Sequence, residues 1–195
     1  AATDIRTAVF DPARVRQNAE RMAFEYESLP QTPTAFSASL PIKTVYTELS
    51  SAESTDQISC LVTNAVAISP QFSIGNATDK ATSEEGRYDF AKVSSVAQLG
   101  IGNSALIVEG EVRIGDRRFA KLILLPVSLR TVDSIVCNEE IVVSVGSRAV
   151  EPNELLSQGD IQHLQRVAAE RSGLRLGFGS EAAYVVITCD SLASA

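Results

Sequence analysis

Alternation of apolar and polar side chains is the feature of this sequence that most restricts its fold. In the stretch ALIVEGEVRI, apolar side chains stand at Leu106, Val108, Val112 and Ile114. Charged side chains stand between them at Glu109, Glu111 and Arg113. A period of two is typical of a β-strand with one buried and one solvated face. The pattern therefore predicts an antiparallel strand whose four apolar side chains share one face.

Several other segments read as strands. Gly115-Asp116 is a turn signal that leads into RRFAKLILLPVSL, so residues 105–129 are predicted to form a β-hairpin whose return strand is buried on both faces. Further strands are expected at residues 42–49, 56–69, 89–99 and 134–146. About six short strands separated by polar turns predict a mainly β fold, an antiparallel β-sandwich or a barrel-like domain.

A short helix is predicted on each side of this β region. In DPARVRQNAERMAFEYESL, Asp11 is a candidate N-cap, Pro12 fits the first helical position, and apolar side chains recur at helical spacing. These apolar residues are Val15, Ala19, Met22 and Tyr26. A connector with three prolines follows at residues 30–41.

The second predicted helix begins at Asp160, taken as its N-cap, and closes at Gly173. Its apolar side is Ile161, Leu164, Val167 and Ala168. It leads into a strand at residues 184–188. These patterns divide the chain into an N-terminal helix and connector (1–40), an antiparallel β domain (41–148), and a helix-strand extension leading into a further α/β domain (149–195).

Composition argues against two classes of partner. The net charge is −7 and the pI is near 4.8, so nucleic-acid binding is not expected without a compensating basic patch. The basic doublet Arg117-Arg118 stands beside Asp116 and reads as a solvated hairpin tip. No apolar run approaches the roughly 20 residues of a membrane helix, so no membrane insertion is expected. No signal peptide is visible, and the start fits a cytosolic protein or a mature form whose signal was removed.

Few residues suggest catalysis. His163 is the single histidine, so any Ser/His/Asp or Cys/His arrangement must use it, and its place near the polar boundary of the second helix favours a structural or solvent-facing role. Cys60 and Cys137 lie inside strand patterns and read as core. Cys189 follows a strand and precedes Asp190, where a small apolar role outweighs a nucleophilic one.

Metal and phosphate chemistry also lack a signature. The cysteines show no C-x-x-C spacing, and the glycine-containing stretches match no nucleotide-binding fingerprint. The acidic pairs Glu84-Glu85 and Glu139-Glu140 fit a solvated turn or strand rim better than a cation site. The sequence therefore predicts no catalytic residue, no metal site and no cofactor.

The order of the segments resembles the N-terminal prodomain of gingipain-type cysteine peptidases. The strongest part is residues 112–146, where a strand, a proline-containing strand, a short turn and an EIVVxV strand follow one another. The matching positions are Phe119, Ala120, Pro126, Val127, Glu140, Ile141, Val142, Val143 and Val145. The run Tyr184–Thr188 with Asp190 is similar to the opening strand of the caspase-like catalytic region of those peptidases.

The resemblance implies a β-sandwich prodomain that assists folding of the enzyme, masks its active site until cleavage, and is not catalytic by itself. Its partner would be the peptidase domain of the same precursor, exported to the periplasm or surface of a bacterium. An exposed polar loop is expected at residues 75–89, and it is the candidate masking segment because an extended strand can enter a substrate cleft. Lys80 and Arg87 are the candidate residues for a specificity pocket that prefers basic side chains.

Some features depart from this family, and two other functions stay open. The first 40 residues are predicted to be helical where strands would be expected, and Cys189 does not match the position of the family's nucleophile. One alternative is a β-sandwich adhesin, a pilin-like protein or another surface interaction module. The other is a small hydrolase that uses His163 with a serine or cysteine.

Overall fold

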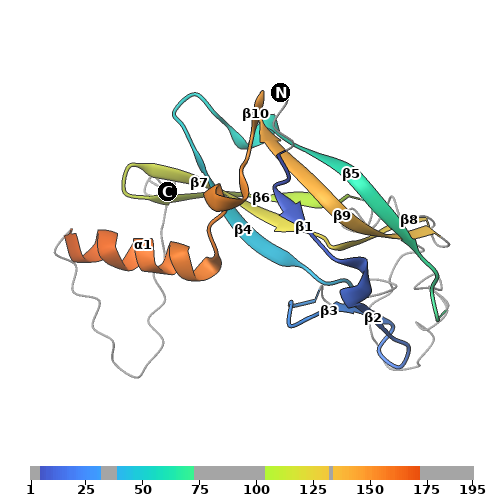
Figure 1. The fold of residues 1–195 in the computed structure, drawn as a ribbon. Helices are drawn as coiled ribbons and strands as arrows, with labels where there is room; N and C mark the ends of the chain where they lie inside the picture. Colours follow the sequence, from blue (N-terminus) through green and yellow to red (C-terminus); the bar gives the residue numbers. More distant parts are fainter. Residues whose placement is uncertain (1–4, 32–38, 73–103, 132–133, 172–195) are drawn as a thin grey trace, which may run out of the picture.

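The computed structural model of the protein describes residues 5–31, 39–72, 104–131 and 134–171. The described chain is mainly β, with antiparallel sheets and one helix near its C-terminal end (Figure 1). The strands are β1 (Ala8–Val9), β2 (Val15–Asn18), β3 (Ala23–Tyr26), β4 (Lys43–Leu49), β5 (Ile58–Ile68), β6 (Leu106–Ile114), β7 (Arg117–Leu124), β8 (Val127–Thr131), β9 (Ser134–Val145) and β10 (Arg148–Ala149). The helix is α1 (Gln158–Arg171), and short 3-10 turns are η1 (Pro12–Arg14), η2 (Thr55–Gln57) and η5 (Pro152–Glu154).

The long strand β9 is the centre of the first sheet, here called the β9 sheet. β5 pairs with β9 along one edge, from Ile58 opposite Val145 to Ile68 opposite Ile135. Three short strands share the other edge, β8 at the start of β9, β1 in its middle and β10 at its end. All of these pairings are antiparallel, so four strands from separate parts of the chain depend on one central strand.

The second sheet, here called the β7 sheet, has the order β4-β7-β6. Its inward side chains, such as Val45 and Leu122, share one buried cluster with Cys137, Ile141 and Val143 of β9. The two sheets therefore pack face to face through this cluster. The expected antiparallel β-sandwich is confirmed, and the sheets do not close into a barrel.

Helix α1 covers the opposite face of the β7 sheet. Tyr46 and Phe119 point to this side, where they cluster with Ile114 and with Ile161 of α1. The predicted helix is thus confirmed, but its N-cap is not Asp160. The Ser157 hydroxyl accepts from the Asp160 N–H (3.2 Å), while the Asp160 carboxylate accepts from the Ser157 N–H (2.7 Å). This reciprocal capping box starts α1 one turn earlier than predicted, with Asp160 in its first turn.

Strand β6 departs from the predicted alternation. Leu106 and Val108 belong to the cluster between the sheets, whereas Val112 and Ile114 belong to the cluster beneath α1. The pairing with β7 shifts between Val108 and Gly110, which has φ +150°. One extra residue at this β-bulge reverses the face of every later side chain. The expectation that all four apolar residues share one face is therefore wrong.

The predicted N-terminal helix is also wrong. Asp11 does cap a turn, since its carboxylate accepts from the Ala13 N–H at 2.9 Å, but this turn is the single 3-10 turn η1. The chain then forms the β2-β3 hairpin, whose turn places Met22 at φ 49°. The hairpin buries Phe24 and Tyr26 in two different core clusters. Burial of these rings outweighs the local helical pattern, because short helices gain little stability without packing.

Other predicted strands coincide with strands of the structure. Residues 42–49 and 56–69 contain β4 and β5, residues 134–146 contain β9, and β6 and β7 form a hairpin around Gly115-Asp116. The predicted hairpin of residues 105–129 is too long, because its return strand ends at Leu124 and the chain then crosses to the β9 sheet as β8. The strands predicted at 89–99 and 184–188 lie outside the described residues, as does Gly173.

Two buried threonines have opposite hydrogen-bonding states. Thr7 donates to the carbonyl of Val150 (2.7 Å) and accepts from the N–H of Val143 (2.8 Å). Its side chain thus connects the segment before β1 with β9 and with the residue that follows β10. Thr47 on β4 is 1% exposed, and its hydroxyl has no hydrogen-bond partner among the described residues. An unpaired buried hydroxyl destabilises the folded state, whereas a paired one is costly to remove.

The same substitution should therefore have opposite effects at the two positions. We expect Thr47→Val to raise the free energy of unfolding by about 1 kcal/mol, because it removes an unsatisfied hydroxyl without changing the shape of the side chain. We expect Thr7→Val to lower it by about 1–3 kcal/mol, because two backbone groups lose their partner. Urea unfolding followed by circular dichroism measures both, and a destabilised Thr47→Val protein would contradict the assignment.

Candidate functional site

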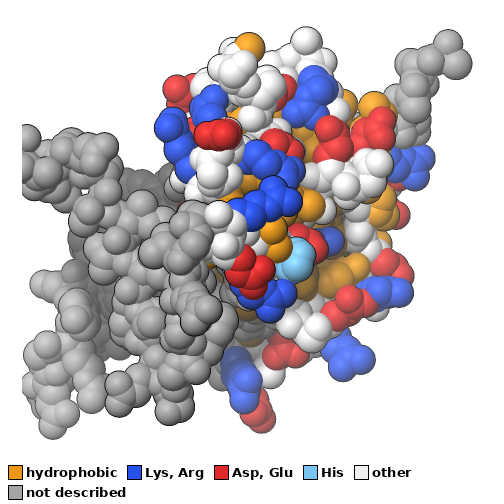
Figure 2. All heavy atoms as spheres, turned by 90° about the vertical axis from the view of Figure 1, so that its left-hand side faces the viewer, with side chains coloured by type: hydrophobic (Ala, Val, Ile, Leu, Met, Phe, Trp, Pro, Cys, Tyr) orange, Lys and Arg blue, Asp and Glu red, His pale blue; other side chains and the backbone are white. Residues whose placement is uncertain are grey.

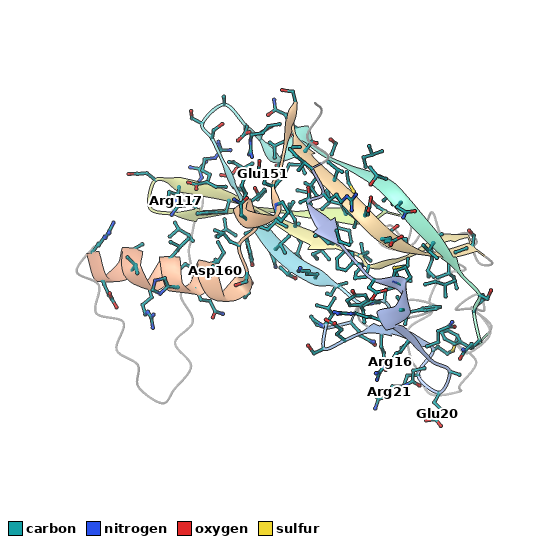
Figure 3. All side chains as sticks on the ribbon, viewed as in Figure 1. Arg16, Glu20, Arg21, Arg117, Glu151 and Asp160 are labelled. Atoms are coloured by element: carbon teal, nitrogen blue, oxygen red, sulfur yellow. The ribbon has the colours of Figure 1, made fainter. Side chains whose placement is uncertain are left out.

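A pocket of about 420 Å³ lies where the edges of the two sheets approach each other. One wall is residues 6–9, which include β1 of the β9 sheet, and the other is Lys43, Thr44 and Val45 of β4 in the β7 sheet. Residues of the segment between η5 and α1 close the pocket, and Asp160 stands at its rim where the helix begins (Figure 3). Its volume is within the range of roughly 300–1,000 Å³ typical of ligand-binding pockets.

The charged side chains of the pocket differ in how far they are already paired. Arg6 forms an ion pair with Glu140 (2.9 Å). Asp160 is held by Ser157, whose side-chain and backbone hydrogen bonds lower the pKa of the Asp160 carboxyl. Lys43 forms no ion pair among the described residues, and its Nζ lies 5.9 Å from the centre of the Phe10 ring. Lys43 is therefore the cation that is available to a ligand here.

The structure places His163 and the thiol of Cys137 on different sides of the β7 sheet. His163 is exposed on α1, and its Nδ1 lies 3.0 Å from a guanidinium nitrogen of Arg166. Figure 2 shows the histidine side chain at the surface among acidic and basic groups. Cys137 is buried between the two sheets, whereas α1 lies on the other side of the β7 sheet. The described residues therefore do not bring Cys137 to His163.

The two described thiols also lack the environment of a nucleophile. Burial raises the pKa of both Cys60 and Cys137 to about 11. Thiols with such pKa values stay protonated at neutral pH, and the thiolate is the nucleophilic form. Cys60 lies opposite Val143, and Cys137 opposite Val66, so the two are not neighbours in the sheet. Both serve the core, as the strand patterns predicted.

The predicted acidic pair Glu139-Glu140 lies on the described part of β9. Glu140 pairs with Arg6 and approaches the hydroxyl of Thr63 (3.3 Å), while Glu139 accepts from the side-chain amide of Asn64 (2.6 Å). The two carboxylates thus have different partners. Within residues 5–31, 39–72, 104–131 and 134–171, no group of three potential metal ligands comes together.

Several predicted candidates lie outside the described residues. They are Lys80, Glu84, Glu85, Arg87 and Cys189.

The basic doublet lies at the tip of the β6-β7 hairpin, as predicted, and both guanidinium groups are occupied. Arg117 donates twice to Glu48 (2.8 and 2.6 Å) and stacks over the ring of Phe119 at 5.0 Å. Arg118 donates twice to Glu111 (2.9 and 2.7 Å). Acidic and basic side chains alternate over this face of the molecule (Figure 2), so the doublet does not form a basic patch.

These ion pairs belong to a network that joins distant segments. Arg118 also donates to the carbonyls of Ser50 and Glu53 in the turn after β4. The Glu53 carboxylate accepts from Arg148 of β10 (3.1 Å), which pairs in turn with Glu154 of η5 (2.8 Å). The network thus connects the hairpin of the β7 sheet with the end of the β9 sheet.

The pocket was not predicted from the sequence. Its walls come from three segments, around residues 6–9, 43–45 and 152–160, and no motif spacing relates them. The sequence indicated this pocket only indirectly, because Lys43 and Val45 belong to the strand predicted at residues 42–49.

Comparisons of the chain with protein families, with curated proteins and with solved structures find no match. In the described part of the chain, no helix is both long enough and apolar enough to cross a bilayer.

The ion-pair network makes stability depend on pH in a defined direction. Hydrogen bonds from Arg118 and Arg113 lower the pKa of Glu111 from 4.5 to about 2. A hydrogen bond from Arg117 lowers the pKa of Glu48. Hydrogen bonds from Ser50 and Arg148 lower the pKa of Glu53. A carboxyl group with a lowered pKa in the folded state stabilises the fold above its unfolded pKa and loses that contribution as the pH falls.

We therefore expect the free energy of unfolding to fall as the pH is lowered from about 4.5 towards about 2. Glu111→Gln should flatten this dependence, because it removes one titrating group from the network. Urea unfolding at a series of pH values in this window measures the slope. Glu20→Gln, on the β2-β3 hairpin, is the control and should leave the slope unchanged; equal slopes in all three proteins would refute the role of Glu111.

Proposed function

We propose that this chain is the prodomain-like N-terminal region of a gingipain-like cysteine peptidase, which assists folding, masks the active site and does not catalyse. One observation carries the proposal. The segment with the strongest resemblance to that family, residues 112–146, supplies the central strands β7 and β9 of the two sheets. The resemblance therefore lies in the residues that organise the fold, and not in a peripheral loop.

A folding assistant needs a core that is independent of the enzyme it assists. The cluster between the sheets combines Leu122 and Leu124 of β7 with Ile141 and Val143 of β9, all fully buried. Strands of the resembling segment thus supply buried side chains to both sides of this cluster. This supports a prodomain that forms its own scaffold.

A non-catalytic role is supported by the separation of His163 from the buried thiol of Cys137. A cysteine peptidase needs a thiolate and a base within hydrogen-bond reach. In this proposal the partner is the catalytic domain of the same precursor, and the protein functions in the periplasm or at the surface of a bacterium. These two points rest on the resemblance alone.

The masking segment proposed here is the loop 75–89 with Lys80 and Arg87. These residues belong to the link between the end of β5 and the start of β6. Ile68 of β5 and Ile107 of β6 pack against the same buried cluster. Both ends of the link are therefore held at one end of the sandwich, which is the arrangement that a loop presented to a partner requires.

A surface interaction module, such as an adhesin or pilin-like domain, is the second candidate. It is favoured by the pocket between β1 and β4, whose walls include exposed side chains such as that of Val9, which is 58% exposed. The two functions differ in their partner, since only the prodomain acts on a peptidase.

Inhibition of a peptidase tests the proposal. We expect the purified chain to inhibit a gingipain-type cysteine peptidase that cleaves after basic residues. The double variant Lys80→Ala/Arg87→Ala should inhibit about tenfold more weakly or worse, because a specificity pocket then loses its charged occupant. Inhibition constants measured with a fluorogenic arginyl or lysyl substrate report the effect.

The matched control removes two basic residues elsewhere. Arg16 and Arg21 project from the β2-β3 hairpin, away from the two sheets (Figure 3), and Arg16→Ala/Arg21→Ala should inhibit like the unaltered chain. No inhibition by the unaltered chain would overturn the masking function. Equal inhibition by all three proteins would keep masking and refute the assignment of the loop residues.

A further inference from the structure

The pocket between β1 and β4 is bounded by the outer edges of two strands from different sheets. In an antiparallel ladder, successive residues direct their N–H and C=O groups to opposite sides of the strand. The Phe10 N–H donates to the Glu139 carbonyl (2.8 Å), and Ala8 stands opposite Ile141. The backbone groups of Val9, between them, therefore point away from β9 and towards the pocket.

The edge of β4 has a corresponding gap. Tyr46 exchanges two backbone hydrogen bonds with Leu156 (2.9 and 2.8 Å) on the side away from β7. Thr44, two residues earlier, directs its N–H and C=O to that same side. Before it, the Ile42 N–H is already taken by the Pro30 carbonyl (2.8 Å). Among the described residues, the outward N–H and C=O of Thr44 are thus unpaired, while Tyr46 after it and the Ile42 N–H before it are paired.

Both strand edges therefore offer free backbone groups to the same space. No hydrogen bond from the outward N–H and C=O of Val9 or Thr44 is found among the residues that the structure describes. Unpaired strand edges of this kind pair with another extended chain. On either side of Thr44 the outward groups of Tyr46 and the N–H of Ile42 are already paired, so an added strand would pair at Thr44 over a short length.

The side chains of the pocket indicate what such a strand would carry. Val45 and Leu155 both pack in or against the cluster between the sheets and line the pocket together, which gives it an apolar wall that suits an aliphatic side chain. Lys43 stands at the same wall without an ion-pair partner among the described residues, whereas Arg6 is paired with Glu140. An acidic side chain beside Lys43 would complete the charge pattern.

We propose that this pocket binds an extended segment of a partner protein as a short added strand, with backbone hydrogen bonds at Thr44 and Val9, an aliphatic side chain against Val45 and Leu155 and an acidic side chain at Lys43. The inference does not rest on the proposed masking function, because the pocket is separate from residues 75–89 in the sequence and is made by other residues. The pocket would be a second binding site of the chain, and it would recognise the backbone of the bound segment.

Titration of the full 195-residue chain with the peptide acetyl-Thr-Val-Thr-Glu-Thr-amide, whose valine and glutamate share one face of an extended strand, tests the proposal. Amide chemical shifts followed by NMR should change at Val9 and Thr44. Two N-methylated versions of the peptide test backbone pairing. One is methylated at its odd-numbered residues and the other at its even-numbered residues, so each lacks the N–H donors of one strand edge. At least one of them should bind about tenfold more weakly on the unaltered chain.

Two variants locate the pairing. Thr44→Pro removes the outward N–H, which β7 does not use, and proline is tolerated at such edge positions. It should weaken binding about tenfold, whereas Thr44→Val, which keeps the N–H, should not. Val9→Pro gives the same test on the other edge if Thr44→Pro fails to fold. Replacing glutamate by lysine in the peptide should also weaken binding, because it places two cations together at Lys43.

The proposal is overturned by any of four results. They are the absence of shifts at about 1 mM peptide, binding of both N-methylated peptides as tight as that of the unmethylated one, binding that both proline variants retain, and shifts confined to other parts of the chain. Self-association of the chain that Thr44→Pro abolishes would likewise overturn it, since the occupant would then be a second copy.

Discussion

Pairing with β9 is the interaction on which most of this structure depends. β5 uses one edge of β9 along its whole length, and β8, β1 and β10 divide the other edge between them. None of these three short strands is long enough to form a stable sheet by itself. The buried hydroxyl of Thr7 strengthens the arrangement, because it satisfies the Val143 N–H where the ladder passes from β1 to β10. β9 then presents Cys137, Ile141 and Val143 to the second sheet, so one strand organises both the hydrogen bonds and the core.

Much of this architecture follows from the sequence, because a strand with one buried and one solvated face carries apolar side chains at a period of two. That period located β6 and β9, and turn residues around short apolar segments located β4, β5 and β7. It failed near the N-terminus, where Val15, Ala19, Met22 and Tyr26 happen to have helical spacing. The side chain that decides the matter is Phe24, which is buried only because Leu40 and Leu125 from other segments lie around it. Contacts of this kind are not visible in a local pattern.

Two features were not predictable from local patterns, namely the β-bulge in β6 and the candidate site. A single extra residue near Gly110 moves Val112 and Ile114 to the face beneath α1, and nothing in the alternation itself marks that position. The pocket is assembled from strand edges, whose free backbone groups are the same in every sequence. Lys43 and Leu156 gain a shared role only after the two sheets have packed and the segment before α1 has crossed the edge of β4.

The hydrogen bond between Thr7 and Val143 joins residues 136 positions apart, and this separation has a consequence for synthesis in the cell. At about 5–20 residues per second, β1 leaves the ribosome on the order of ten seconds before its partner strand exists. β5 waits in the same way, with its edges open, until β9 follows. Folds dominated by such distant pairings form slowly. Before β9 is made, the nascent chain can form local hairpins such as β2-β3 and β6-β7, but β1 and β5 stay unpaired, and the sandwich can close only when nearly all of its residues have been made.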